Sequence, residues 1–149
     1  MTVSAAVAAD LADLTRLFAG YLRFYQVPRD EAQIAAFLGL RLQLGDSQLF
    51  IARSEQGAAQ GFVQLYPFHS SLALEPAWLL SDLYVDESAR RSRVGEALMN
   101  AARAHAEATG ACGLQLETAK TNLAGQSLYQ RLGYVRDEQF FTYWLSLRG

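Results

Sequence analysis

Residues 78–99, WLLSDLYVDESARRSRVGEALM, constrain the fold of this chain more than any other stretch. An apolar run with β-branched and aromatic members covers Trp78 to Val85 and predicts a buried strand. A short polar turn from Asp86 to Arg91 follows, and a helical pattern opens at Val94. A strand, an arginine-rich turn and a helix start in this order can bind phosphate, because the turn aims N–H groups inward and the helix start adds partial positive charge. The stretch therefore predicts a site for a pyrophosphate-bearing cofactor.

Composition places the chain among folded, near-neutral proteins. It has 149 residues, of which 51% are hydrophobic and 19% charged, which suits one folded domain and excludes disorder. The net charge of −2 gives no global basic field for nucleic acid or anionic lipid. Arg90, Arg91 and Arg93 nevertheless form a local basic patch, which fits a small anion better than a polyanion. We therefore expect no nucleic-acid partner and no membrane partner.

Cysteine and histidine usage bounds the compartment and the metal chemistry. The single cysteine, Cys112, allows no internal disulfide, which favours a reducing compartment, and it reads as a buried small hydrophobe. The first basic residue is Arg16, so no signal peptide is recognised, and no apolar run is long enough to span a bilayer. Two histidines and one cysteine offer no ligand spacing for a metal. These features predict a cytoplasmic protein without a metal.

The remaining elements predict an α+β (α/β) fold in one domain, residues 1–149. Strand, helix and strand with short links between residues 78 and 118 predict a right-handed crossover and a parallel strand pair. Residues 67–77 read as a loop. We expect a mixed central sheet of about six to seven strands, flanked by about four helices. The expected strands cover residues 2–4, 49–53, 61–66, 78–85, 114–118, 134–136 and 140–147, and the expected helices 11–22, 31–44, 94–109 and 122–132.

Two segments together resemble a known superfamily. RRSRVGEALM resembles the acyl-CoA-binding motif Q/R-x-x-G-x-G/A of the Gcn-related N-acetyltransferases (GNAT), with Arg90 at the first position and Gly95 at the last. LQLETAKTNLAGQSLYQRLGY resembles the second signature of the same superfamily. The order and spacing of both segments agree, so the resemblance covers essentially the whole chain. The segments YLRFY, YPFHSS and ETAKTN are loosely similar to the histone and polyamine acetyltransferase-like branch.

The resemblance implies an enzyme, an acetyl-CoA-dependent N-acetyltransferase that modifies a primary amine of a small molecule or a peptide. Direct attack in a ternary complex is the implied route. Arg93 occupies the central glycine position of the motif, and we expect it to adopt a backbone angle open to ordinary residues. The implied cofactor-binding residues are Leu83, Tyr84, Val85, Arg90, Arg91, Ser92, Arg93, Val94, Gly95, Glu96, Asn122 and Tyr129.

Three side chains are candidates for proton transfer. An alkyl ammonium must lose a proton before it attacks a thioester, and the departing thiolate gains from a proton donor. By resemblance, Tyr129 is the acid and Glu117 the base. Asp82 competes for the role of base, because an uncompensated carboxylate inside an apolar strand is costly; we rank Glu117 ahead of it.

Structural interpretations stay open beside these roles. Glu117 also suits a strand-end carboxylate that accepts from loop amides, Tyr129 a core aromatic, and Asn122 the cap of the last helix. For the whole protein, the alternatives are a non-catalytic acyl-CoA-binding or regulatory module and a nucleic-acid-binding domain. The apolar closing strands permit a homodimer.

Overall fold

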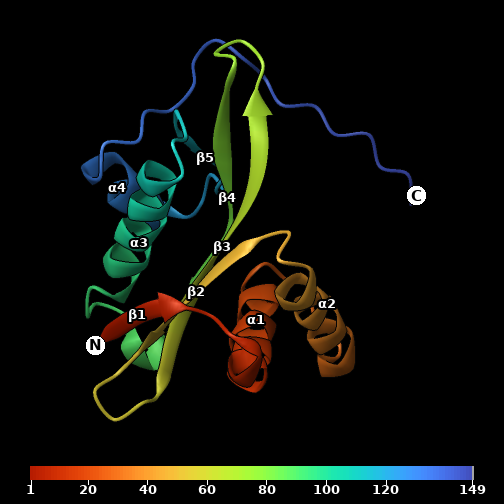
Figure 1. Ribbon diagram of the computed structural model, residues 1–149, viewed down its shortest axis with the longest axis vertical. Helices are drawn as coiled ribbons and strands as arrows, with labels where there is room; N and C mark the ends of the chain where they lie inside the picture. Colours follow the sequence, from red (N-terminus) through yellow and green to blue (C-terminus); the bar gives the residue numbers. More distant parts are fainter. Residues whose placement is uncertain (149) are drawn as a thin grey trace. The chain divides into compact units, whose positions relative to one another are not determined.

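A computed structural model describes residues 1–148, which fall into two units, Met1–Glu117 and the residues from Thr118 onward (Figure 1). The first unit holds all of the sheet and three α-helices, and the second holds one α-helix. The elements of the first unit are β1 (Thr2–Ala5), a 3-10 turn (Ala8–Asp10), α1 (Leu11–Phe24), α2 (Glu31–Leu44), β2 (Gln48–Arg53), β3 (Ala59–Ser70), β4 (Glu75–Val85), a 3-10 turn (Glu87–Ala89), α3 (Val94–Ala108) and β5 (Leu114–Leu116). The second unit contains α4 (Leu123–Arg131).

The sheet is mixed, as the sequence predicts. Its strands follow the order β1-β2-β3-β4-β5, and the first four are antiparallel to their neighbours. β4 and β5 run parallel across the crossover through α3, which confirms the predicted pair. The four helices also agree with the prediction.

The expected count of six to seven strands is wrong for the described residues, which form five. Residues 134–136 and 140–147 carry a strand pattern, but neither segment belongs to the sheet. The Tyr134 amide, for example, donates to the Tyr129 carbonyl at the end of α4 at 3.0 Å and not to a strand. An alternating pattern favours extended backbone, but a strand also requires a neighbour that accepts its hydrogen bonds.

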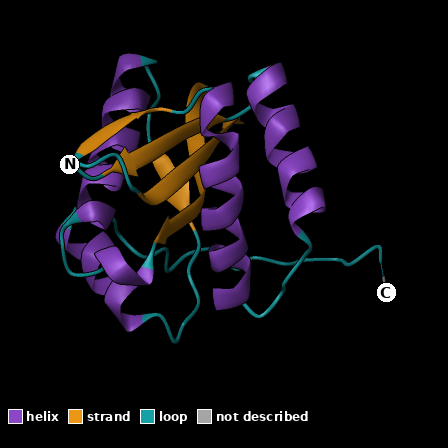
Figure 2. Cartoon of the chain, turned by 90° about the horizontal axis from the view of Figure 1, so that it is seen from below, coloured by secondary structure: helices purple, strands orange, loops and turns teal. Residues whose placement is uncertain are grey.

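Adjacent residues of β3 show which helices cover each face of the sheet. Phe62 stacks on Phe18 of α1, with ring centroids 5.4 Å apart. Its neighbour Gly61 points the opposite way, and a Cβ there would lie 3.1 Å from Leu98 of α3. Because successive strand residues face opposite sides, α1 and α2 cover one face and α3 the other (Figures 1 and 2).

Polar contacts fix the ends of α2 and the start of α1. The Asp30 carboxylate accepts the Gln33 amide at 2.9 Å and caps α2, and Gly45 ends it with φ +63°. Asp10 does not cap α1; its carboxylate accepts the Val7 amide and pairs with Arg53 of β2 at 2.8 Å. The buried side chains between α1, α2 and the sheet are Leu14, Leu17, Phe18, Ala19, Ile34, Leu38, Leu49, Ile51, Ala59 and Phe62.

The expected loop at residues 67–77 is mostly strand. β3 continues to Ser70 and β4 starts at Glu75, so the two strands form a long hairpin. Pro67 is unusual inside a strand because proline lacks an N–H group. β2 pairs with β3 only as far as Leu65, however, so the chain around Pro67 has a free edge on that side and proline fits there.

Two findings bear on the surroundings of the protein. Among residues 1–148, no helix is both long enough and apolar enough to cross a membrane. The same residues contain no group of three His, Cys, Asp or Glu side chains suited to a metal ion.

Cys112 is exposed, so the expectation of a buried thiol is wrong. It lies in the connection between α3 and β5.

Candidate active site

The parallel strands β4 and β5 separate within the first unit. β5 pairs with β4 only from Trp78 to Leu80. β4 continues from Ser81 to Val85 with β3 on one side, and on the other side residues 1–148 supply no paired strand. These five residues therefore present an unpaired strand edge, which we call the open edge, at the carboxyl ends of two parallel strands.

A β-bulge marks the point where the open edge begins. Gln64 of β3 pairs with Asp82, but the next residue, Leu65, pairs with Leu80. Ser81 is therefore an extra residue on β4, and such a residue bends its strand and redirects its side chains. The bulge was not predicted from the sequence, in which the polar pair Ser81-Asp82 inside an apolar run was the available signal.

Hydrogen-bond alternation identifies the main-chain groups that face the open edge. The Asp86 amide donates to the Gln60 carbonyl of β3 at 2.8 Å. In an antiparallel pair, alternate residues bond to the neighbour, so Tyr84 and Asp82 also point their main chain at β3. Leu83 and Val85 point theirs away from β3, toward the open edge.

The turn after β4 adopts backbone angles that ordinary residues rarely use. Arg91 has φ +65° and Arg93 has φ +66°, both in the left-handed region. The expectation that Arg93 has an ordinary angle is therefore wrong: the chain keeps the glycine-like conformation of the motif without the glycine. Left-handed residues in a turn make successive N–H groups converge, which forms a concavity suited to an anion.

The start of α3 adds further donors beside this turn. Arg93 is the N-cap, and its side chain makes no capping hydrogen bond. The first-turn N–H groups of a helix have no partner inside it, so those of Val94 and Gly95 suit an external acceptor. The Ser92 hydroxyl donates to the Ala89 carbonyl and so holds the turn.

The arginine side chains of the turn are exposed, and one is positioned by aromatic rings. The Arg90 guanidinium lies 5.7 Å from the ring centroid of Tyr84 and 6.0 Å from that of Phe24. Its Nε donates to the Val85 carbonyl at 3.2 Å. Main-chain donors, an uncapped helix start and three arginines fit a pyrophosphate group.

Asp82 lies in a polar network on the α1 face of the sheet. Its carboxylate accepts Gln64 Nε2 at 2.9 Å, and Gln64 Oε1 accepts the Ser47 hydroxyl at 2.8 Å. Gln64 is fully buried. Burial raises the pKa of Asp82, and hydrogen bonds from Gln64, Tyr21 and Ser81 oppose that rise without cancelling it. Burial, helped by the charge of Asp82, also raises the pKa of Tyr66 to about 12.

Tyr21 of α1 hydrogen-bonds this carboxylate and belongs to a cluster of aromatic rings from α1 and β4. The Tyr21 hydroxyl donates to the Ser81 carbonyl at 3.3 Å, and its ring lies 6.5 Å from that of Tyr84. Tyr25 packs edge-on against Tyr21 at 5.2 Å. Gly20 permits the close approach of the Tyr84 side chain to α1, because a Cβ at position 20 would lie 2.6 Å from the Tyr84 hydroxyl. A carboxylate among π faces suits a cationic amine.

The other predicted site residues follow β5. Glu117 lies one residue beyond β5 and is exposed. In the second unit, the Asn122 side chain accepts the Gly125 amide at 3.2 Å and donates to the Thr118 hydroxyl at 3.0 Å, so it caps α4. The Tyr129 ring lies 6.2 Å from that of Tyr134. The structure gathers Asp82, the open edge and residues 90–96 in one unit, and contacts of Asn122 and Tyr129 with a cofactor stay predictions.

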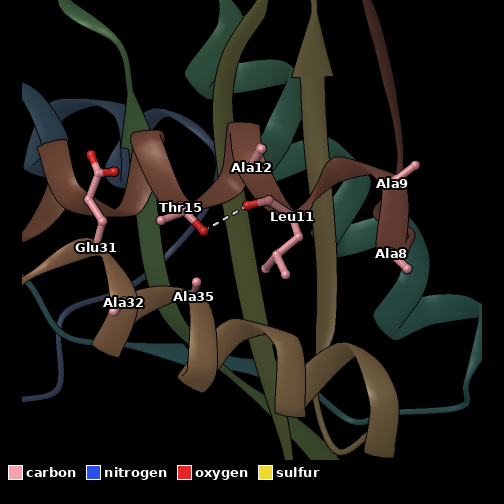
Figure 3. Close-up of a pocket in the computed structure, with 8 residues that line it drawn as sticks. All are labelled: Ala8, Ala9, Leu11, Ala12, Thr15, Glu31, Ala32 and Ala35. Carbon is pink, nitrogen blue, oxygen red and sulfur yellow. Dashed lines mark hydrogen bonds between the residues drawn. The ribbon is translucent and has the colours of Figure 1, made fainter.

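A shallow hollow of about 610 Å³ lies between the first turns of α1 and α2 and shares no lining residue with the open edge (Figure 3). Alanine side chains form most of its lining. The Thr15 hydroxyl is already bonded to the Leu11 carbonyl at 2.7 Å, which leaves the Glu31 carboxylate as its charged group. We therefore assign the open edge, and not this hollow, as the candidate active site.

Comparisons with known proteins identify the class of enzyme to which this fold belongs. The profile of the Acetyltransferase (GNAT) family matches residues 12–134. The chain therefore belongs to the GNAT acetyltransferase family, and the enzyme is an acetyltransferase.

Individual relatives support the same assignment. The Uncharacterized N-acetyltransferase YhfO of Bacillus subtilis (strain 168) is 37% identical over 147 residues, which cover 99% of this chain and 98% of the relative. A probable acetyltransferase of Haemophilus influenzae is 37% identical over 90 residues, 60% of this chain and 62% of the relative. The crystal structure of a probable acetyltransferase is similar with a TM-score of 0.93 and 33% identity, over 100% of this chain and 99% of that chain.

Proposed function

We propose that this acetyltransferase moves the acetyl group of acetyl-CoA to a primary amine by direct attack in a ternary complex. The observation that carries the proposal is the continuity of the open edge with the arginine turn and the uncapped start of α3. The extended part of acetyl-CoA can pair with the open edge while its pyrophosphate lies at the arginine turn.

Each part of the proposed cofactor site has a separate task. The main chain of Leu83 and Val85 hydrogen-bonds the extended arm of the cofactor. Arg90, Arg91 and Arg93 supply charge to the pyrophosphate, and the amides of residues 94–96 supply directional donors. Acetyl-CoA supplies an activated acetyl group as a thioester. A main-chain N–H at the open edge polarises the thioester carbonyl.

We place Asp82 ahead of Glu117 as the base. The sequence favoured Glu117 through its place in the second signature, but the environment of Asp82 is better suited to the task. Burial raises the pKa of Asp82 and so brings it closer to that of an amine, and Gln64 fixes one carboxylate oxygen. Tyr129 stays our proposed acid, and Asn122 our proposed further contact of the cofactor.

The acceptor site lies on the α1 face in this proposal. Tyr21 and Tyr84 line the approach to Asp82 with aromatic surface, which favours an ammonium group on an apolar carrier. The loose similarity to the histone and polyamine branch supports polyamines and lysine peptides as first candidates. A single cysteine and one predicted domain support a cytoplasmic enzyme of residues 1–149.

A CoA-release assay with an amine panel tests this function. The panel contains polyamines, lysine peptides, peptides with free amino termini and small aromatic amines. We expect saturable CoA release with at least one class, and loss of release when the amine is already acetylated. Binding of acetyl-CoA without release across the panel would favour a non-catalytic acyl-CoA-binding module, and no binding at all would contradict the proposal.

A further inference from the structure

Gln64 is a fully buried polar side chain in the middle of an apolar strand. Its neighbours along β3, Val63 and Leu65, are also buried, and the exposed fraction of Gln64 is 0%. A buried amide is costly unless its oxygen and its nitrogen both have hydrogen-bond partners. Both atoms have one: Oε1 accepts the Ser47 hydroxyl at 2.8 Å, and Nε2 donates to the Asp82 carboxylate at 2.9 Å. Gln64 therefore connects Ser47 to Asp82.

The register of the sheet places these three side chains in one row. Gln64 pairs with Leu49 of β2 on one side and with Asp82 of β4 on the other, and Ser47 comes directly before β2. Residues directly opposite each other in antiparallel strands have their side chains on the same face, so Gln64 and Asp82 share the α1 face. The pair lies immediately beside the bulge at Ser81. The backbone therefore holds the amide against the carboxylate where the open edge begins.

The end of α2 fixes the position of Ser47. Gly45 ends the helix with φ +63°, and the Asp46 carboxylate pairs with the Arg41 guanidinium of the last helical turn at 2.7 Å. The residue before Ser47 is thus bonded back to α2, and β2 begins directly after Ser47. A hydroxyl held on both sides of the chain can donate to Gln64 with little further loss of conformational freedom.

The charge of Asp82 determines how the Gln64 amide is turned. An ionised carboxylate only accepts hydrogen bonds, so Nε2 of Gln64 must face it and Oε1 must face away. Oε1 then needs a donor inside the protein, and the Ser47 hydroxyl supplies it. Hydrogen bonds in such a chain polarise one another. The bond from Ser47 therefore strengthens the bond from Gln64 to Asp82.

We propose that Gln64 and Ser47 are positioning residues for Asp82, which hold one oxygen of its carboxylate and stabilise its ionised form. The inference rests on the proposed function, in which Asp82 takes the proton of the acceptor amine. A structural role alone would be met by an apolar side chain of the same size, as at Val63 and Leu65. The two roles therefore differ in what the change Gln64→Met does to the titration of Asp82.

Other groups around Asp82 stay unchanged in such a variant. Hydrogen bonds from Tyr21 and Ser81 also lower the pKa of Asp82, against the effect of burial. The groups that face Asp82, or act on a group that does, are Tyr21 of α1, Arg41 and Asp46 at the end of α2, Tyr66 of β3, and Ser81 and Tyr84 of β4. Because all of them remain, a change in the titration of Asp82 reports the loss of the hydrogen bond from Gln64.

Carboxyl titration of the full chain tests this inference without turnover. Carbon-13 NMR of labelled aspartate follows each carboxyl, and the signal that disappears in Asp82→Asn belongs to Asp82. Gln64→Met keeps the length of the side chain but removes the donor, and should raise the pKa of Asp82 by about one unit or more. Ser47→Ala should raise it by less, and Ser47→Thr, which keeps the hydroxyl, should leave it unchanged. Gln60→Met, the same change four residues earlier on β3, is the matched control and should also leave it unchanged.

Turnover across pH connects this positioning to the chemistry. With an amine that supports CoA release, the acidic limb of Gln64→Met should move to higher pH by the same amount as the carboxyl titration. Turnover on the plateau should fall roughly 10- to 100-fold, while KM for acetyl-CoA stays within about threefold. Circular dichroism checks that each variant is folded.

The two measurements separate the possible failures. A pKa of Asp82 that does not move in Gln64→Met overturns the inference and leaves the role of Asp82 as base open. A pKa that moves while the acidic limb of turnover stays in place shows that Asp82 is not the base, and overturns both the proposed role of Asp82 and this inference. An equal shift in Gln60→Met would also overturn the inference, because the effect would not depend on the bond to Asp82.

Discussion

β4 and residues 140–147 have the same kind of sequence but different secondary structure. Both are runs rich in aromatic and branched residues. β4 pairs with β3 along nearly its whole length and with β5 over three residues, whereas residues 140–147 form no strand. The difference teaches that side-chain alternation specifies an extended backbone, and that a neighbouring edge decides whether a strand forms. In β4 the edge from Ser81 to Val85 has no partner in β5, and we propose that a cofactor pairs with it.

The largest expected effect concerns Asp82, which lies just beyond the last residue of β4 that pairs with β5. Asp82→Asn should lower turnover by about 10²–10⁴-fold at neutral pH, because the amide cannot accept the proton of the amine. In the wild type, turnover should fall as the pH drops through the pKa of Asp82, which burial places above 3.8. Steady-state rates across pH check both statements.

Glu117→Gln is the matched comparison for this prediction. It should retain turnover within about tenfold and keep the acidic limb of the pH profile. If Glu117→Gln loses turnover and the limb while Asp82→Asn keeps them, the base is Glu117 and the order of the two carboxylates is reversed.

The next prediction sharpens the contrast between a packed strand and a free edge. Gly61→Ala should lower the free energy of unfolding by about 1–3 kcal/mol, because the new Cβ would lie 2.6 Å from the Tyr84 carbonyl oxygen. Gly113→Ala, next to β5, meets no atom within 4 Å and should be neutral or stabilising by up to about 1 kcal/mol. Urea unfolding measures both, and equal effects would mean that Gly61 has room the structure does not show.

A smaller effect is expected at the strained turn after β4. Arg93→Gly should raise the free energy of unfolding by about 1 kcal/mol, because glycine adopts the φ of +66° without steric cost. Acetyl-CoA affinity should stay within about tenfold, since the main-chain donors remain. Arg90→Gly is the control: Arg90 has φ −67°, so no strain is relieved and stability should not rise. A gain of stability in Arg90→Gly, or none in Arg93→Gly, would contradict this account of the turn.

The smallest expected effect concerns His105 of α3. Burial lowers the pKa of His105, whose ring lies 4.8 Å from Trp78 and 5.7 Å from Phe50. The unfolded chain therefore binds a proton at a higher pH than the folded one, so His105 should reduce stability as the pH falls below 6.5. His105→Gln should flatten that part of the stability curve. An unchanged slope in thermal unfolding between pH 5 and 7 would remove His105 as the cause.

Local chemistry made much of the fold predictable from the sequence. The Asp30 cap and the glycine at position 45 specify the bounds of α2, and the order strand, turn and helix around Val94 specifies the crossover. The turn that we propose for the cofactor was predictable as a turn for the same reason, because its signal lies in a few consecutive residues.

The features that the sequence did not reveal depend on contacts between distant residues. The bulge at Ser81 depends on the register between β3 and β4, and the raised pKa of Asp82 on its burial beside Gln64. The left-handed angle at Arg93 is a property of the turn as a whole, which residue preference argues against. Residues 140–147 were expected to form a strand because their alternating pattern favours extended backbone. The pattern does not show which strand edge would pair with them.

Hydrogen exchange of the full chain with and without acetyl-CoA tests the central claim most directly. Our account predicts that saturating acetyl-CoA slows exchange at the amides of Leu83 and Val85 and at residues 94–96, and raises stability by about 2.7 kcal/mol at a hundred times its dissociation constant. Unchanged exchange at these amides with millimolar acetyl-CoA, or protection confined to other segments, would contradict the assignment of the open edge as the cofactor site.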